Sequence, residues 1–348
     1  MLDLYTDYLI CSFSQTSATG MASLLSGNVS HDQITRFLSE EERTSKDLWK
    51  IVKPSLREIE TEDGCLVFDD TVEEKPYTDE NDIIAWHFDH TVGRSVKGIN
   101  TLNCIYTNGE KTLPVSFEIV KKTERFIDPK TGKEKRRSLR NKNAMLQEIL
   151  DQMLHNAVKF RYVLTDIWFG STETMTHIQE KKKYFVLPLK ENRLIALSEE
   201  EKRKGQFRAV SLQAIETGRT VKVYLKGLAF PVYLVRQVFT NKDGGSGTLY
   251  LVTNDRTLDF ESVTNIYHKR WRIEEFHKSI KSNTGFSKSP TQTVRTQSNH
   301  FFASICANVK LECLKWKRGK NHFALKAEIY AQALQGAFSE LRKLQEAV

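Results

Sequence analysis

Three acidic residues stand at positions from which their carboxylates could act together. Asp69 and Asp166 each follow a short apolar run with the pattern of a buried strand, and Glu274 lies within residues 265–281, which have the period of a helix. Carboxylates at the ends of neighbouring strands converge in space, and one from a helix can complete the cluster. Without a cation they would repel one another, and all-oxygen ligands favour Mg²⁺ or Mn²⁺. The pattern predicts a site for such ions, two of which, about 3.5–4 Å apart, promote phosphodiester chemistry.

The first position of this cluster has two candidates. Asp69 and Asp70 follow the same apolar run, so the residues alone leave open which of them faces the other acids. A lone aspartate at a strand end is more often a turn or cap residue than a metal ligand. The assignment to chemistry therefore depends on acids at three separate positions.

A single helix is predicted over residues 265–281. Tyr267, Arg270, Glu274 and Lys281 fall within an arc of about 60° when each residue advances about 100°. A second arc of about 80°, expected to be the buried face, gathers Ile266, Ile273, Phe276 and Ile280. A salt-bridged surface is the ordinary explanation of such a charged line. Its place beside the buried face, where charges need partners, and the two acids upstream favour a functional explanation.

Residues 1 to about 60 are predicted to be helical. Short helices are expected over residues 16–26 and, capped by Ser30, over residues 31–38, followed by a longer helix over residues 45–59 that is interrupted or kinked at Pro54. A helix, a tight turn and a second helix within about 22 residues suit a helix-turn-helix DNA reader. A small helical bundle has the same pattern, so both interpretations stay open.

From Gly64 onward the pattern is that of a mixed sheet with helices. Strands are predicted over residues 65–68, 99–106, 112–120, 160–165 and 184–189. Asn108-Gly109 predicts a hairpin, Ser171 is expected to cap a helix up to about residue 183, and another helix is predicted over residues 143–159. The charged stretch 121–142 is predicted to be a mobile loop.

The region before the helix predicted over residues 265–281 is rich in residues that favour β-strands. Strands are predicted over residues 220–225, 230–239 and 249–253, and they form a β-rich element inserted at about residues 190–253. Two helices, 294–317 and 322–346, close the chain. The fold class is therefore α/β, with a helical region 1–60, a catalytic domain 61–290 that carries the insertion, and C-terminal helices 291–348.

Composition limits the kind of protein without naming a partner. The 348 residues carry a net charge of +8, which permits a polyanionic partner such as nucleic acid. No apolar run is long enough to span a membrane, and acids near Met1 argue against an export signal. The five cysteines form no C-x-x-C pair, which predicts buried thiols in a reducing compartment.

The late helix resembles a known family. The spacing Tyr267-x2-Arg270-x3-Glu274-x6-Lys281 is similar to the Y-R-E-K signature of bacterial insertion-sequence transposases of the DDE type. Asp69-Asp70-Thr71 is similar to the family's first motif, D-x-[S/T], with Asp69 leading. Asp166, before Ile-Trp-Phe-Gly, resembles its second motif, and the resemblance covers roughly residues 60 to 285.

This resemblance implies a fold and a reaction. It implies a ribonuclease-H-like catalytic domain with a β-rich insertion before the glutamate. It implies a DNA transposase that binds the terminal inverted repeats of its element, cuts, and joins the 3′ ends to target DNA. The implied ligands of two Mg²⁺ or Mn²⁺ ions, and the catalytic residues, are Asp69, Asp166 and Glu274. The implied DNA-binding residues are Tyr267, Arg270, Trp271 and Lys281.

The same resemblance implies partners and a place in the cell. The partners are double-stranded DNA, at the element ends and at the target, and a second copy of the chain in the DNA complex. The place is the bacterial cytoplasm, at the nucleoid, with no membrane. Two rival functions are a ribonuclease-H-like nuclease without strand transfer and an inactive or domesticated DNA-binding protein.

One position departs from the family. Relatives that form hairpin-ended DNA carry a tryptophan four residues before the equivalent of Thr253, and here that position is Leu249, next to Tyr250. Stacking on a flipped base needs an aromatic face. We therefore expect hairpin-ended DNA to be absent or minor among the products, although Trp271 matches the family.

Overall fold

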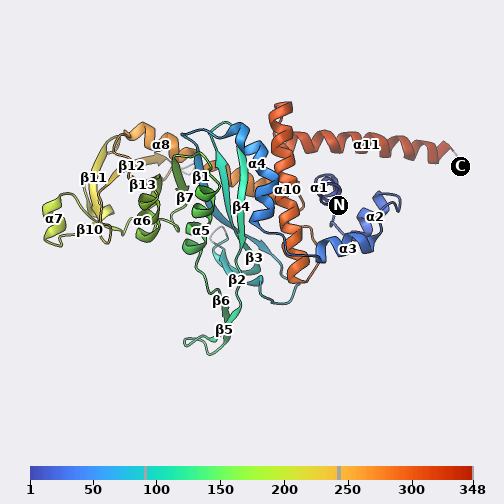
Figure 1. Ribbon diagram of the computed structural model, residues 1–348, viewed down its shortest axis with the longest axis horizontal. Coiled ribbons are helices and arrows are strands. Elements are labelled where there is room, and N and C mark those ends of the chain that lie inside the picture. The colour runs from blue at the N-terminus through green and yellow to red at the C-terminus, as the bar shows by residue number, and fades with distance from the viewer. Residues whose placement is uncertain (90–91, 241–243, 347–348) are drawn as a thin grey trace.

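The computed structural model describes residues 1–89, 92–240 and 244–346, and a large mixed sheet runs through its middle (Figure 1). The described part of this sheet has eleven strands in the order β10-β9-β11-β12-β13-β8-β7-β1-β3-β2, with β4 also paired to β3. The strands are β1 (Cys65–Glu74), β2 (Ile84–Asp89), β3 (Arg94–Thr107), β4 (Thr112–Ile119), β7 (Tyr162–Thr165), β8 (Tyr184–Leu189), β9 (Leu194–Ala196), β10 (Arg208–Ala209), β11 (Thr220–Leu225), β12 (Val232–Thr240) and β13 (Ser246–Thr253).

Five strands at the centre have the arrangement of a ribonuclease-H-like fold. β1, β3 and β4 are antiparallel neighbours, whereas β7 pairs with β1 and β8 pairs with β7 in parallel. Parallel strands need a crossover connection, and α5 (Lys142–His155) and α6 (Thr172–Glu180) provide the two crossovers. The predicted α/β class and mixed sheet are confirmed.

Helices cover the sheet and extend beyond it (Figure 1). Their bounds are α1 (Leu2–Cys11), α2 (Ala18–Leu24), α3 (His31–Ser39), α4 (Ser45–Ile59), α7 (Glu199–Arg203), α8 (Phe260–His268), α9 (Trp271–Asn283), α10 (Val294–Arg318) and α11 (His322–Glu346). Ser30 caps α3 with a capping box, as predicted. Pro54 lies inside α4, which runs unbroken through it, so the predicted interruption is wrong.

The N-terminal helices divide between two apolar cores. Leu48, Val52 and Leu56 of α4 pack into the main core around the sheet. α1, α2 and α3 instead pack with α10 and the start of α11 in a second, smaller core. The division of the chain into three domains stays a prediction, but α4 shares its packing with the catalytic part.

Two parts of the sheet differ from the sequence-based expectation. The stretch predicted as a mobile loop contains a two-stranded hairpin, β5 (Glu124–Ile127) and β6 (Glu134–Arg137), which projects from the body (Figure 1). β2 was not predicted, because Trp86 and Phe88 are exposed while His87 between them is buried, the reverse of the usual apolar and polar alternation of a strand. The inserted β-element was predicted correctly, and it extends the main sheet because β13 pairs with β8.

The remaining expectations concern membranes and cysteines. Among the described residues, every helix is too short or too polar to span a lipid bilayer. All five cysteines are free, and Cys65, Cys104 and Cys306 are buried as predicted. Cys11 is exposed, contrary to prediction, because it ends α1 at the surface.

Candidate active site

The pairing of two strands brings Asp69 and Asp166 together. β1 and β7 run in parallel with Phe68 opposite Thr165, so the next residue on each strand is one of the two aspartates. Asp166 follows the end of β7, as predicted. Asp69 does not end its strand, because β1 continues antiparallel to β3 as far as Glu74. The sequence missed this because polar residues replace the apolar run where the pairing with β7 stops.

The predicted single helix over residues 265–281 is wrong, since α8 ends at His268 and α9 begins at Trp271. Between them the backbone makes tighter i to i+3 bonds, with the Lys269 and Arg270 amides donating to residues three positions earlier. Tyr267 thus comes from α8, Arg270 from the junction and Glu274 from the first turn of α9. The predicted apolar face is buried at Ile273, Phe276 and Ile280 and half-buried at Ile266.

One cavity receives all three acids. It has a volume of about 360 Å³, and the residues lining it are Asp69, Asp70, Thr71, Val72, Phe88, Asp89, Asp166, Trp168, Glu274, His277, Lys278 and Lys281. Asp69, Asp166 and Glu274 therefore share a space at one end of the parallel strands, and we refer to it as the carboxylate cavity. Tyr267 and Arg270 border the same acids.

Burial and like charges both act on the acids of this cavity. Burial, reinforced by the neighbouring charges of Asp166, Asp70 and Glu274, raises the pKa of Asp69 to about 8. Burial also raises the pKa of Tyr267 to about 12, and Asp166 and Asp69 add to the effect against the opposing charge of Arg270. Burial is the main cause of both shifts, and the neighbouring acids add to it.

Arg270 is the cation nearest to the acids. Its Nη1 lies 3.1 Å from Glu274 Oε1 and 3.8 Å from Asp69 Oδ2, so those two oxygens are at most about 7 Å apart. Within the described ranges, no three His, Cys, Asp or Glu side chains are close enough together to hold a metal ion as they stand. Hard oxygen donors facing one space nevertheless fit Mg²⁺ or Mn²⁺, because a cation would offset the like charges that add to the effect of burial on the pKa of Asp69.

Asp69 and Asp70 have different surroundings. Asp70 Oδ2 accepts hydrogen bonds from Lys142 Nζ at 2.5 Å and Asn100 Nδ2 at 2.8 Å. Asp69 Oδ1 accepts a hydrogen bond from the Asp70 amide at 2.8 Å, and Asp69 otherwise faces Arg270 and the other acids of the cavity. The geometry therefore favours Asp69 as the first acid of the cluster, because the charge of Asp70 already has a lysine partner.

The other predicted DNA-binding residues lie at the edges of the site. Lys281 lines the carboxylate cavity and donates to the Val72 carbonyl at 2.8 Å. Trp271 is 60% exposed and lines a neighbouring cavity instead. Leu249 is half-buried against the main core, and Tyr250 beside it is buried, so Tyr250 offers no free ring for stacking.

The sequence did not single out three residues that line or support the cavity. His277 is buried one turn after Glu274, and its Nε2 accepts a hydrogen bond from Asn103, the residue opposite Asp69 on β3. Trp168 is half-exposed near Asp166, whose Oδ1 accepts the Trp168 amide. The i+3 spacing of His277 from Glu274 was the available signal, whereas the part played by Asn103 depends on strand register.

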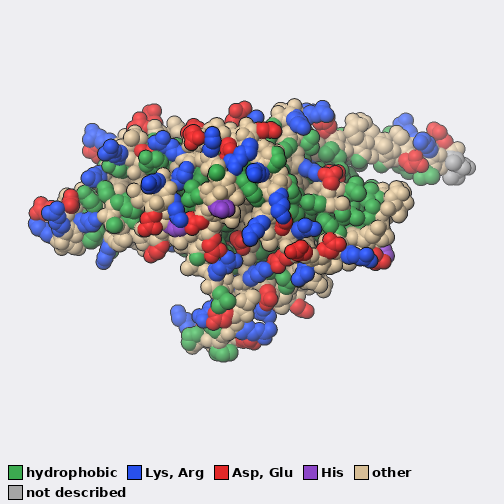
Figure 2. All heavy atoms as spheres, viewed as in Figure 1, with side chains coloured by type: hydrophobic (Ala, Val, Ile, Leu, Met, Phe, Trp, Pro, Cys, Tyr) green, Lys and Arg blue, Asp and Glu red, His purple; other side chains and the backbone are tan. Residues whose placement is uncertain are grey.

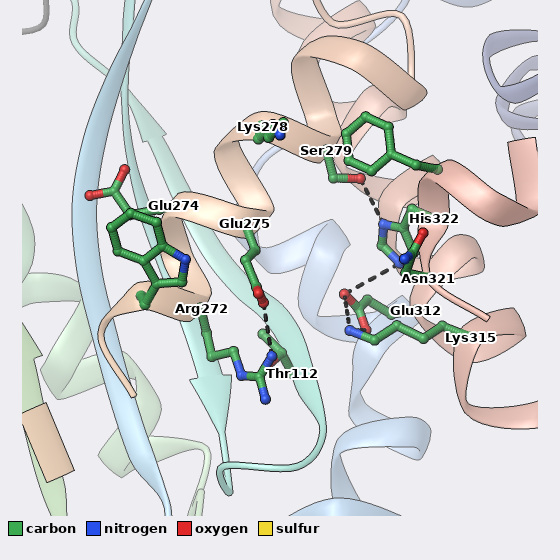
Figure 3. A pocket seen from close by; sticks show the side chains of 12 residues that line it. Thr112, Arg272, Glu274, Glu275, Lys278, Ser279, Glu312, Lys315, Asn321 and His322 are labelled. Carbon is green, nitrogen blue, oxygen red and sulfur yellow. Dashed lines mark hydrogen bonds and ion pairs between the residues drawn. The ribbon is translucent and has the colours of Figure 1, made fainter. Parts of the chain in front are cut away.

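A second and larger cavity lies on the other side of α9 (Figure 3). Its volume is about 590 Å³, and it shares Glu274 and Lys278 with the carboxylate cavity. Inside it, His322 Nδ1 lies 2.6 Å from Ser279 Oγ, and Glu312 is within 3.3 Å of His322 and 3.2 Å of Lys315. This network joins α9, α10 and α11, so we refer to the space as the three-helix cavity.

Comparisons with known proteins identify a family for this chain. A family model described as a transposase DDE domain matches residues 138–309, and one described as a DDE superfamily endonuclease matches residues 1–204. No curated protein matches the chain.

One solved structure that matches is the crystal structure of Kluyveromyces polysporus Argonaute with a guide RNA, with 13% sequence identity and a TM-score of 0.23. That match covers 69% of this chain and 28% of the Argonaute chain. Its TM-score is too low to indicate a shared fold. The endonuclease model alone matches more than half of the residues. The chain therefore belongs to the DDE superfamily of transposases and endonucleases.

Proposed function

We propose that this protein is a DNA transposase in which Asp69, Asp166 and Glu274 hold one or two Mg²⁺ or Mn²⁺ ions. The observation that carries the proposal is the meeting of these three carboxylates in one cavity, where neighbouring acids add to the effect of burial in raising the pKa of Asp69. When bound, the ions would activate the attacking oxygen and stabilise the leaving oxygen of a phosphodiester. Two of the ligands come from adjacent strands, which keep them rigid, and Glu274 comes from the start of α9.

The basic residues around the cavity suit the DNA backbone. Arg270 presents a planar fork that matches a phosphate, and Lys281 provides a point charge from the other end of α9. Tyr267 lies beside Arg270, whose guanidinium carbon is 5.7 Å from the tyrosine ring centre. In this proposal the three residues orient the scissile phosphate, and Trp271 contacts the DNA next to it. Leu249 supports a cleavage route with little or no hairpin-ended DNA.

The helical N-terminal region is proposed to bind the element ends. α2 and α3 pack against each other in the smaller core and expose polar side chains such as Gln33 and Arg36. A helix-turn-helix reader would place one such helix in the major groove of a terminal inverted repeat. This role would separate recognition of the element ends from chemistry in the sheet.

A second copy of the chain is the proposed protein partner. α11 stands away from the body (Figure 1). Its exposed apolar residues recur at steps of four, three and three, namely Leu334, Phe338, Leu341 and Leu344. Such spacing forms a stripe that pairs with another helix of the same kind. This stripe supports the proposal of a homodimer in the DNA complex, and the proposed place of that complex is the bacterial cytoplasm, at the nucleoid.

The test begins by selecting bound molecules from a pool of random duplexes, which yields the recognised end sequence. The selected duplex is then incubated with Mg²⁺ and a second, unlabelled duplex. Transposase activity predicts 3′-OH ends that become joined to the second duplex, and Glu274→Gln should abolish cutting and joining while binding persists. Cutting without joining would indicate the nuclease rival, and binding without cutting by the unaltered protein would indicate the DNA-binding rival.

A further inference from the structure

The β5–β6 hairpin stands out because it buries little and serves no visible packing purpose. It spans residues 124–137, and every residue of its two strands is exposed or half-exposed. It projects from the edge of the molecule where β2 and β3 end (Figure 1). An isolated two-stranded hairpin is at best marginally stable in water. A projecting hairpin of this kind is therefore better explained by a partner than by the stability of the fold.

The hairpin carries an excess of positive charge. Residues 124–137 contain six basic and three acidic side chains, a net charge of +3. Basic side chains cover much of its surface in Figure 2, with a few acidic ones between them. Arg125 forms an ion pair with Glu134 across the two strands, and Arg137 forms one with Glu124. These pairs help to hold the two strands together.

The tip of the hairpin keeps its charges available. Lys130 and Lys133 lie in the connection between the strands, are exposed, and make no ion pair within the described part of the chain. Directly opposed residues share a face of the hairpin, so each face presents both basic and apolar groups. Arg137, for example, lies over the ring of Phe126, with its guanidinium carbon 5.3 Å from the ring centre.

The base of the hairpin is tied to the carboxylate cavity. Only residues 138–141 separate β6 from Lys142, whose Nζ bonds Asp70 next to Asp69. Five residue steps reach at most about 18 Å, which is less than one helical turn of DNA, about 34 Å. Just before β5, Lys122 donates to the backbone carbonyl of Trp86 on β2, and Arg136 of β6 pairs with Asp82, just before β2. These contacts fix the base of the hairpin beside β2.

We propose that the β5–β6 hairpin enters the major groove of the duplex within about one helical turn of the phosphodiester held at the carboxylates. The inference rests on the proposed function. The major groove, about 12 Å wide and 8.5 Å deep, admits a two-stranded β-ribbon. Each strand of the hairpin has four residues and is roughly 13 Å long at about 3.3 Å per residue, which exceeds the depth of the groove. Lys130 and Lys133 contact phosphates at the groove edges.

The test compares two variants of equal charge. Lys130→Gln/Lys133→Gln removes the two tip charges without breaking an ion pair, and Lys53→Gln/Lys317→Gln removes two exposed charges from α4 and α10. Both are made in the Glu274→Gln background, so that the duplex obtained by selection stays intact. Binding is measured over a range of salt concentrations, and protection of guanine N7, an atom of the major groove, is mapped by methylation.

The tip variant should flatten the slope of log K against log salt by about 1.8, which corresponds to two phosphate contacts. It should also lose N7 protection within about one helical turn of the cut site, while the control variant keeps both properties. An unchanged slope and protection pattern in the tip variant would overturn the inference. If the unaltered protein fails to cut but the tip variant still loses slope and protection, the proposed chemistry fails and the groove contact stands.

Discussion

The two cavities on either side of α9 share Glu274 and Lys278 but differ in how their charges are balanced. In the carboxylate cavity, Asp69 lies near Asp70, Asp166 and Glu274, with Arg270 as the nearest cation. In the three-helix cavity, Glu312 and Glu275 each lie beside a basic side chain. Glu312 is paired with Lys315 and His322, and Glu275 is paired with Arg272.

The comparison shows that the volume of a cavity does not identify it as the active site. The three-helix cavity is larger, at about 590 Å³ against about 360 Å³, and holds a serine, a histidine and a glutamate in contact. Ser279 is nearly buried, however, and burial, with help from Lys315, lowers the pKa of His322 to about 4. Glu312 lies 3.2 Å from Lys315 and Glu275 lies 2.9 Å from Arg272, whereas Asp69 lies 3.8 Å from Arg270 and near three other acids. Unbalanced charge is therefore the better guide to chemistry.

The largest expected effect separates two adjacent glutamates on α9. Glu274→Gln keeps the shape of the side chain but removes a charge from the carboxylate cavity, so cleavage in Mg²⁺ should fall by about a thousandfold or more, roughly 4 kcal/mol. Glu275→Gln is the matched control, because Glu275 pairs with Arg272 in the other cavity. Cleavage rates of the selected duplex, with binding measured in parallel, give the answer. A normal rate for Glu274→Gln and a collapsed rate for Glu275→Gln would reverse the assignment.

The next effect concerns pH. Since folding raises the pKa of Asp69 from 3.8 to about 8, the metal-free folded protein holds a proton that the unfolded chain releases between those values. Stability should therefore fall by a few kcal/mol as the pH rises from about 4 to about 8. Asp69→Asn should flatten this slope, because its side chain does not titrate, and should be more stable than the unaltered protein at pH 8. Thermal unfolding without metal, at several pH values, measures this.

Asp70→Asn and added metal serve as controls for the pH prediction. Asp70→Asn should keep most of the slope, because burial is the main cause of the shift at Asp69. Mg²⁺ or Mn²⁺ should raise the melting temperature of the unaltered protein at pH 8 and leave that of Asp69→Asn nearly constant. If Asp69→Asn retained the full slope, another acid would be responsible for it.

The sequence predicted the acids better than their supporting elements. Asp69, Asp166 and Glu274 were recognisable because apolar runs and helical spacing are local signals. Their meeting depends on the parallel pairing of β1 with β7, which a mixed α/β order predicts at the level of topology. The arrangement of the five central strands could be predicted from the sequence for the same reason.

Features that leave no mark on the local apolar pattern could not be predicted from the sequence. The break between α8 and α9 leaves the apolar pattern intact, so periodicity predicted one helix. The β5–β6 hairpin is held by ion pairs rather than an apolar face, and its charges predicted a loop. The pairing of Lys142 with Asp70, which separates the two aspartates, joins residues 72 positions apart and has no local signal.

The three-helix cavity should respond to mutation through stability alone. His322→Ala removes the contacts to Ser279 and Glu312 and should destabilise the protein by about 1–3 kcal/mol, because it leaves buried polar groups without partners. Phe323→Ala, at a neighbouring and more exposed residue of α11, is the control and should cost less. Denaturant unfolding and the cleavage rate per folded molecule are measured together. A large loss of rate in folded His322→Ala would show that this cavity takes part in the reaction.

The smallest expected effect tests whether Arg270 changes partners when DNA binds. In the free protein Arg270 neutralises Glu274 and Asp69, and a metal ion at those carboxylates would release its fork for a phosphate. Arg270→Ala should therefore flatten the salt dependence of binding by roughly one counterion, a slope change of about 0.9, when divalent metal is present. Arg272→Ala is the control, because Arg272 is held by Glu275 and the Gly109 carbonyl on the other side of α9. Binding titrations at several salt concentrations, with Ca²⁺ in place of Mg²⁺ to prevent cutting, measure both slopes. Equal slope changes in the two variants would mean that DNA contacts both sides of α9 equally. If neither slope changed, Arg270 would only neutralise the acids and would not contact DNA.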